Sequence, residues 1–169
     1  MAGAMTSAPP EMQAALQLMD EGFNRPGWHG PSLLASLRGL THAELLFRPG
    51  EDAHNAWELA LHCAYWKHTV QNRVAPGSAP LFALAGSNFF RRETVLTPVD
   101  WRKDLSLLKT THARLRGVVI GLKLKSLDVK LPASRHTYRR TIFGIAAHDI
   151  YHAGQISLLK KLARADRAG

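Results

Sequence analysis

Hydrophobic residues recur along most of the chain at steps of three and four residues, the spacing that places them on one face of an α-helix. The first such run is Met12, Leu16, Met19 and Phe23. The longest run extends over three heptads and contains Trp101, Leu105, Leu108, His112, Leu115, Val119 and Leu122. Pro10 and Pro98 stand where these runs begin, and proline suits the first helical position because its missing N–H would be unpaired there. We therefore predict helices over about 10–23 and 98–122.

Three further helices are predicted in the first half of the chain, and capping signals mark the start of two of them. Asn55 is followed three residues later by Glu58, and Thr41 is followed at the same spacing by Glu44. A polar cap residue with an acidic residue at this distance is typical of a helix N-terminus. The predicted helices of this region are 32–38, a short helix that begins after Thr41, and about 56–74.

The last helix is predicted over about 141–163. Apolar residues alternate briefly before it, so a short extended stretch is expected over 123–131. The connection over roughly 76–97 is long and contains Pro80, Gly86, Phe82, Phe89 and Phe90. Four long helices with two connections of about 20 residues predict an all-α fold, a four-helix bundle with crossover connections and short extra helices. We expect a single domain over 1–169 with its core over about 10–163.

Composition excludes several classes of protein. The single cysteine, Cys63, rules out an internal disulfide framework and a multi-cysteine zinc site. No stretch of about 18 apolar residues is present, so no membrane-spanning helix and no membrane partner are expected. Residues 1–10 lack the basic and apolar regions of a signal peptide. These observations favour a soluble, cytoplasmic protein.

The net charge of +9 is unevenly distributed. Residues 1–90 carry five basic and seven acidic side chains, whereas residues 91–169 carry 17 basic and six acidic ones. Such asymmetry can indicate anion or nucleic-acid binding. The basic residues are scattered singly or in pairs, and no nucleic-acid-binding motif accompanies them. A solvated basic surface is the preferred interpretation, and nucleic acid is the least favoured partner.

Two of the nine histidines are separated by four residues in the last predicted helix, so their side chains stand one above the other. His148 and His152 can therefore bind one metal ion, as paired histidines do in helical zinc motifs. Their face is predicted to point toward the core, because it also carries Ile145, Gln155, Ile156, Leu158, Leu159 and Leu162. The opposite face carries Ala146, Ala147 and Ala153, among others. The alternative is that hydrogen bonds and trapped water satisfy the two imidazoles.

A third metal ligand would come from another helix. His62 is the candidate, because it shares a mixed polar and apolar face of the helix predicted over 56–74. His54 could approach a site from the N-terminal end of that helix, and His112 is expected to be a satisfied core residue. The other histidines, His29, His42, His68 and His136, are expected to be peripheral.

Four segments together resemble the DinB-like family of bacterial proteins described as metalloenzymes. They are HNAWELALHCAYWKH (54–68), HDIYHAGQISLLKK (148–161), WHGPSLLASLRGL (28–40) and PVDWRKDLSLL (98–108). The resemblance implies a four-helix bundle with an unusual crossover and one divalent metal held by a histidine triad, here His62, His148 and His152. Relatives in the wider superfamily use zinc in thiol-dependent transfers or isomerisations, and others are described as damage-inducible or stress-related. The family name does not imply DNA binding.

Three imidazoles would leave at least one coordination position open, which is typical of catalytic sites. Zinc is the expected ion, with nickel, iron, cobalt and manganese as alternatives, because imidazole discriminates weakly among them. Glu58 and Gln155 each lie one turn from a proposed ligand and could orient an imidazole or a bound water. Glu58 has a competing role as the partner of Asn55 at the helix N-terminus. The connection over 76–97 either covers the site or is a plain crossover.

These observations predict a metal-dependent enzyme, a transferase or hydrolase that acts on a small molecule and that could use a low-molecular-weight thiol. One alternative is a helical bundle that dimerises or binds another protein and contains a structural metal. The other alternative is a nucleic-acid binder that uses the basic C-terminal half. The expected partners are a small-molecule substrate and, in a dimer, a second copy of the chain.

Overall fold

The computed structural model describes residues 9–123 and 126–167. It contains α1 (Pro10–Phe23), α2 (Leu33–Leu37), α3 (His42–Leu46), α4 (Ala56–Val74), α5 (Pro98–Gly121) and α6 (Tyr138–Asp166). The described residues form no strand and only two isolated β-bridges, so the predicted all-α class is confirmed. Within the same residues, no helix is both long enough and apolar enough to cross a membrane.

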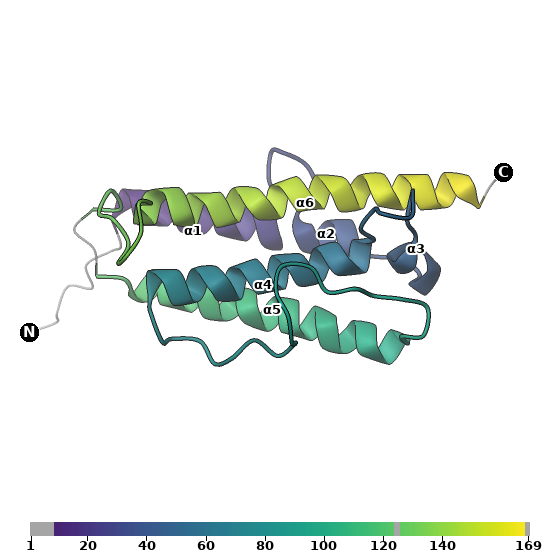
Figure 1. The fold of residues 1–169 in the computed structure, drawn as a ribbon. Coiled ribbons are helices and arrows are strands. Elements are labelled where there is room, and N and C mark those ends of the chain that lie inside the picture. The colour runs from purple at the N-terminus through teal and green to yellow at the C-terminus, as the bar shows by residue number, and fades with distance from the viewer. Residues whose placement is uncertain (1–8, 124–125, 168–169) are drawn as a thin grey trace, which may run out of the picture.

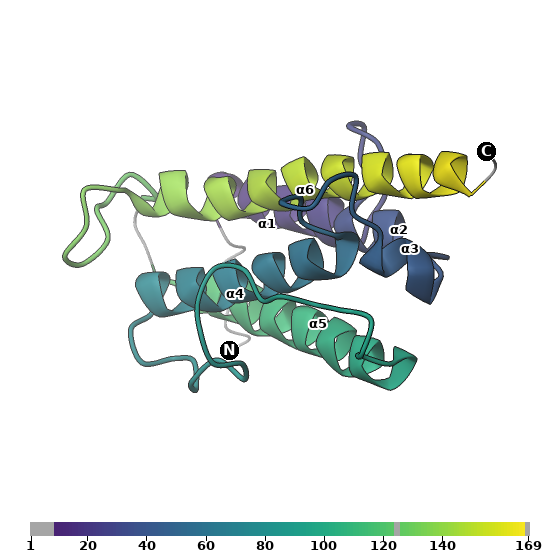
Figure 2. The same cartoon turned by 45° about the vertical axis from the view of Figure 1, so that its right-hand side comes forward.

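The four long helices form a bundle with one crossover (Figures 1 and 2). Around the bundle, α4 packs against α5, α5 against α1, α1 against α6, and α6 against α4. Figure 1 shows that α4 and α5 run in the same direction, so the chain over 75–97 returns along the bundle before α5 begins. The short helices α2 and α3 pack near the C-terminal half of α6. The predicted four-helix bundle is therefore confirmed, with one crossover where the sequence predicted crossover connections.

Most helix boundaries follow the predicted signals. Thr41 and Glu44 form the expected capping box, with the Glu44 N–H donating to Thr41 Oγ1 at 3.2 Å. The last helix begins three residues earlier than predicted, because Thr137 caps it by accepting a hydrogen bond from the Arg140 N–H at 3.2 Å. Of the predicted extended stretch, 124–125 lie outside the described residues, and the rest contributes only a bridge between Lys130 and Thr137.

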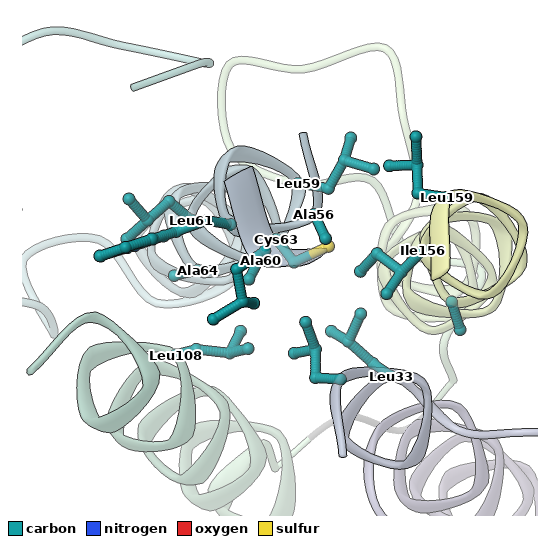
Figure 3. Close-up of a cluster of buried hydrophobic side chains, with 14 of the residues drawn as sticks. Leu33, Ala56, Leu59, Ala60, Leu61, Cys63, Ala64, Leu108, Ile156 and Leu159 are labelled. Carbon is teal, nitrogen blue, oxygen red and sulfur yellow. The ribbon is translucent and has the colours of Figure 1, made fainter. Parts of the chain in front are cut away.

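The centre of the bundle is a closely packed apolar core (Figure 3). Side chains of α4, including Leu59 and Cys63, face Ile156 of α6, Leu108 of α5 and Leu33 of α2. Burial of such side chains contributes roughly 1.5–3 kcal/mol each to stability. This core holds α4 and α6 side by side, which places the histidines of the two helices next to one another.

Candidate metal centre

The structure brings the three predicted ligands together on adjacent helices. His62 projects from α4, and His148 and His152 project from successive turns of α6. The Nε2 atom of His148 lies 3.0 Å from Nε2 of His62 and 3.2 Å from Nε2 of His152. These residues form a group whose ligand atoms could hold one metal ion.

Two of the three distances between the ring nitrogens fit a tetrahedral ion, and all three ligand atoms lie within 4.8 Å of one another. With zinc–nitrogen bonds of about 2.0–2.1 Å, two tetrahedral ligand atoms lie about 3.3 Å apart. The observed 3.0 and 3.2 Å lie close to that separation. The donor set therefore suits one divalent ion.

Hydrogen bonds fix two of the three imidazoles in the tautomer that a metal requires. His62 Nδ1 donates to the backbone oxygen of Asn88 at 3.0 Å, and His152 Nδ1 donates to Oε1 of Gln155 at 2.6 Å. A proton on Nδ1 leaves the lone pair of Nε2 free in a neutral imidazole. Nδ1 of His148 is buried and has no hydrogen-bond partner among the described residues.

Burial keeps all three imidazoles neutral. Desolvation, followed by the neighbouring His152 and His62, lowers the pKa of His148 to about 3. Desolvation also lowers the pKa of His152 to about 4 and that of His62 below its usual value. Because a metal binds the neutral form of histidine, the triad is in its ligating state at neutral pH.

Asn88, which the sequence patterns did not single out, supports His62 from the crossover. Its backbone has φ of 65°, in the left-handed region that most non-glycine residues avoid. Its backbone oxygen accepts from His62, and its Oδ1 accepts from Nε1 of Trp66 at 3.0 Å. Two bonds from α4 therefore hold a strained residue in place, as is common at functional sites. The sequence signal was weak: asparagine merely tolerates this conformation better than other residues.

Phe89, the next residue of the crossover, also packs against the site. Its ring stacks on His62 with centroids 4.1 Å apart and on His54 with centroids 3.7 Å apart. The crossover thus covers one side of the candidate site, which answers the question that the sequence left open for the connection over 76–97.

Gln155 lies where the sequence predicted a supporting residue. Besides accepting from His152, it donates from Nε2 to the Tyr151 hydroxyl at 3.1 Å. Both contacts lie along one face of α6, because these residues are three or four positions apart. Gln155 therefore links the proposed ligand to an exposed tyrosine.

Glu58 is buried and contacts His54 rather than one of the three proposed ligands. Its carboxylate accepts from the Arg48 guanidinium, from the Arg92 N–H at 2.8 Å and from His54 Nδ1 at 3.1 Å. Burial acts to raise its pKa, but the bonds from Arg48, Arg92 and His54 together lower it. Its backbone N–H donates to Asn55 Oδ1 at 2.9 Å, so it also occupies its predicted position at the start of α4.

The predicted inner face of α6 was right in part. Its residues Ile145, His152, Ile156 and Leu159 are buried. Leu158 and Leu162 are instead 57% and 40% exposed, and Ala146 and Ala153 of the predicted outer face are buried. Small residues explain the difference: a Cβ on Gly22 of α1 would lie 3.0 Å from the Ala146 oxygen, so α1 and α6 approach closely along the small-residue face. Leu158 and Leu162 are left at the edge of the core, where they meet solvent.

A second group of potential ligand atoms, from Cys63, His148 and Asp149, is unsuited to a metal. Lys67 and Asp149 form a buried ion pair, so Oδ2 of the carboxylate is already bound. Burial raises the pKa of the Cys63 thiol, and this keeps it protonated, although a metal requires the thiolate. The prediction that Cys63 packs in the core agrees with its complete burial.

A hollow of about 500 Å³ opens beside the triad. His62, His152 and Gln155 reach its wall, together with His54, and apolar residues form much of the rest. The apolar lining includes Leu59, Phe89, Leu158, Leu159 and Leu162. Concave sites with an apolar wall and a few convergent polar groups are typical of small-molecule binding.

Comparison with known proteins gives one family. The profile of the DinB superfamily matches residues 28–156, which include all three histidines of the triad. Neither the curated proteins nor the solved structures give a significant match to the chain.

Proposed function

The chain belongs to the DinB superfamily, and from this premise we propose that it is a metal-dependent enzyme for a small-molecule substrate. In this proposal His62, His148 and His152 hold one divalent ion, and a fourth position stays open. Zinc is the preferred ion, with nickel, iron, cobalt and manganese as alternatives. The reaction is a transfer or a hydrolysis, with a low-molecular-weight thiol as a candidate cosubstrate.

One observation carries the proposal. Nε2 of His62 and Nε2 of His152 lie 3.0 and 3.2 Å from Nε2 of His148. On the other side of each ring, Nδ1 of His62 and Nδ1 of His152 donate to a fixed acceptor. The two imidazoles whose Nδ1 atoms donate turn their Nε2 lone pairs toward His148, as ligands of a shared ion would. Metal-binding histidines are usually oriented by a hydrogen bond from the other ring nitrogen.

Bound at this position, a divalent ion would lower the pKa of a water or thiol and polarise a substrate oxygen. The protein's own residues supply binding and orientation. Gln155 and Asn88 hold the imidazoles, and the apolar wall of the hollow excludes water from the apolar part of a ligand. Tyr151, held by Gln155, presents a hydroxyl at the edge of the same hollow.

Elemental analysis of protein purified without a nickel column tests the metal. About one divalent ion per chain is expected, and His148→Ala and His152→Ala should each abolish its retention. His68→Ala is the matched control, because His68 is bonded to the Pro80 oxygen away from the triad and its loss should leave the metal content unchanged. Circular dichroism of each variant separates loss of metal from loss of fold.

The open position is tested with cobalt-substituted protein. A thiol that binds the ion should produce a new ligand-to-metal charge-transfer absorption that saturates with thiol concentration. Retention of metal by the double variant His148→Ala/His152→Ala would overturn the ligand assignment. If the protein binds a full complement of metal but its absorption does not change with thiol and no water exchanges at the ion, the ion has no open coordination position.

A second candidate function is a dimerising bundle with a structural metal. The observation in its favour is the exposure of Tyr151, Leu158 and Leu162 along one face of α6, at 63%, 57% and 40%. Contiguous exposed apolar residues often mark contact surfaces. Sedimentation of the wild type and of Leu158→Glu tests the second function, because the dimer should dissociate in the variant. A structural metal is tested separately: the protein should unfold when the metal is chelated.

A further inference from the structure

A groove between α4 and α6 reaches the triad from the side of His148. It consists of two adjoining hollows of about 210 and 550 Å³ that share Arg73, His136 and Thr141. His148 lies at one end of the smaller hollow, next to Trp66, Ile145 and Gly144. The groove is therefore a second approach to the candidate metal centre, separate from the apolar hollow described above.

Arginine side chains gather in this groove without acidic partners among the described residues. Eight of the fourteen arginines in the chain form ion pairs with described residues, for example Arg92 with Asp104 and Arg116 with Asp20. Three of the remaining six line the groove, and neither hollow has an aspartate or glutamate in its wall. These three are Arg73, Arg135 and Arg140. Much of the basic charge is thus neutralised within the protein, but not here.

Each of these arginines is carried by a well-defined element. Arg73 lies over the ring of Trp66, 5.4 Å from its centroid, and Arg140 lies in α6. Arg135 belongs to the turn over 131–136, which is closed by a bond of 2.9 Å from the Leu131 N–H to the His136 oxygen. Ala133 in this turn has φ of 50°, a strained conformation that the surrounding bonds maintain.

The N-terminus of α6 is not what would attract an anion. Its first free N–H groups are already bound: Tyr138 donates to the Val129 oxygen at 3.0 Å and Arg139 donates to the Leu127 oxygen at 2.8 Å. The positive potential of the groove therefore comes from guanidinium groups. Arginine binds carboxylates and phosphates through paired hydrogen bonds, so the groove suits either of these anions.

Helical spacing connects the arginines with the metal centre. Arg140, Gly144 and His148 are four residues apart on one face of α6, and Gly144 leaves the floor of the groove open, since an added Cβ would have no neighbour within 4 Å. Trp66 and Val70 form the facing wall on α4. A molecule anchored at Arg140 can thus extend past Gly144 to His148.

We propose that this groove binds the anionic end of a small organic substrate or cosubstrate, a carboxylate or a phosphate, whose apolar part lies against Trp66 and Ile145 and whose reactive group reaches the triad. The inference rests on the proposed function and adds the substrate's charge and orientation to it.

Calorimetric titration of the metal-loaded protein with benzoate and with phenyl phosphate tests the groove. Both probes combine an anion with an apolar ring, and the tighter of the two identifies the anion that the groove prefers. Arg140→Gln should weaken binding about tenfold or more, since one charge-assisted hydrogen-bond pair is removed. Gly144→Leu should abolish binding by filling the floor, and it should still fold because leucine favours a helix over glycine.

Arg102→Gln is the matched control, because Arg102 is an exposed arginine of α5 outside the groove and makes the same change of charge. It should bind both probes like the wild type. Equal binding by all four proteins would overturn the proposal, and so would tighter, Arg140-dependent binding of a single-stranded oligonucleotide. Metal content is measured on the same samples. If metal is present but binding does not depend on Arg140, only the proposal of an anion-binding groove fails. If binding depends on Arg140 but no metal is retained, only the proposal of a metal-dependent enzyme fails.

Discussion

Gln155 accepts a hydrogen bond from Nδ1 of His152 at 2.6 Å, and through this bond it sets which nitrogen of the imidazole faces the other two histidines. The amide is itself anchored by its bond to the Tyr151 hydroxyl. A supporting residue thus belongs to the same helix as the proposed ligand, and its position three residues later follows from the helical repeat.

Gln155→Leu should therefore lower metal affinity by about tenfold to a hundredfold, the usual cost of removing a partner of a ligating histidine. Gln155→Glu keeps an acceptor oxygen at the same place and should retain most of the affinity. Competition with a chromogenic chelator measures both. Equal affinity in wild type and Gln155→Leu would show that the bond does not orient His152 for a metal.

Asn88→Ala should destabilise the protein by about 1–2 kcal/mol, because alanine fits the left-handed backbone less well and the bond to Trp66 is lost. Asn88→Gly relieves the backbone cost and loses only the side-chain bond, so it should be the milder change. Urea denaturation of the metal-free proteins gives the order. If Asn88→Ala loses less stability than Asn88→Gly, the backbone at this residue is not strained.

Lys67→Met should be among the most destabilising single changes in α4, at about 3–5 kcal/mol, because it leaves the Asp149 carboxylate buried without its partner. The double variant Lys67→Met/Asp149→Leu should recover most of this loss, since a well-packed apolar pair often replaces a buried ion pair. Urea midpoints after chelation of any metal test the two values. A double variant as unstable as the single one would refute the explanation.

The free energy of unfolding should fall as the pH drops below about 6.5, in part because of His112. Burial, followed by the charges of Lys67 and Arg116, lowers the pKa of this imidazole to about 3, and its ring stacks on Phe23 with centroids 3.6 Å apart. The unfolded chain binds a proton near pH 6.5. The folded chain does so only near pH 3, so stability is lost between these values and not above them.

In His112→Leu this contribution disappears, and the loss of stability between about pH 7 and about pH 4 should be smaller than in the wild type. The two proteins share the three histidines of the triad, so the difference between their pH profiles isolates His112. Parallel profiles would mean that His112 is protonated in the folded protein at the same pH as in the unfolded chain.

Local signals predicted the helices well, because caps and apolar periodicity act within a few residues. The Asn55 cap and the heptads over 101–122 correspond to α4 and α5 with boundaries within one residue of those predicted. The start of α6 was missed by three residues, since Thr137 carries a cap signal without an acidic partner. The inner face of α6 was predicted only in part, because the burial of Ala146 depends on how closely Gly22 allows α1 to approach.

The triad followed from helical spacing together with the family resemblance, but its surroundings did not. Asn88 and Phe89 reach His62 from 26 and 27 residues away along a connection without regular structure. The burial of Lys67 against Asp149 spans 82 residues, and nothing in the pattern of either helix indicates it. Contacts of this range depend on the packed bundle and are invisible to local periodicity.

The placement of the triad also has a consequence for the topology of the chain. His62 and His148 are 86 residues apart in sequence, and the segment between them includes the whole crossover and α5. An ion bound by both residues would be a reversible cross-link that closes a loop of about half of the chain. Unfolding would then have to break a coordination bond or keep that large loop closed, which costs chain entropy. Removal of the ion would therefore do more than empty a metal site: it would open a ring that contains the whole crossover and α5.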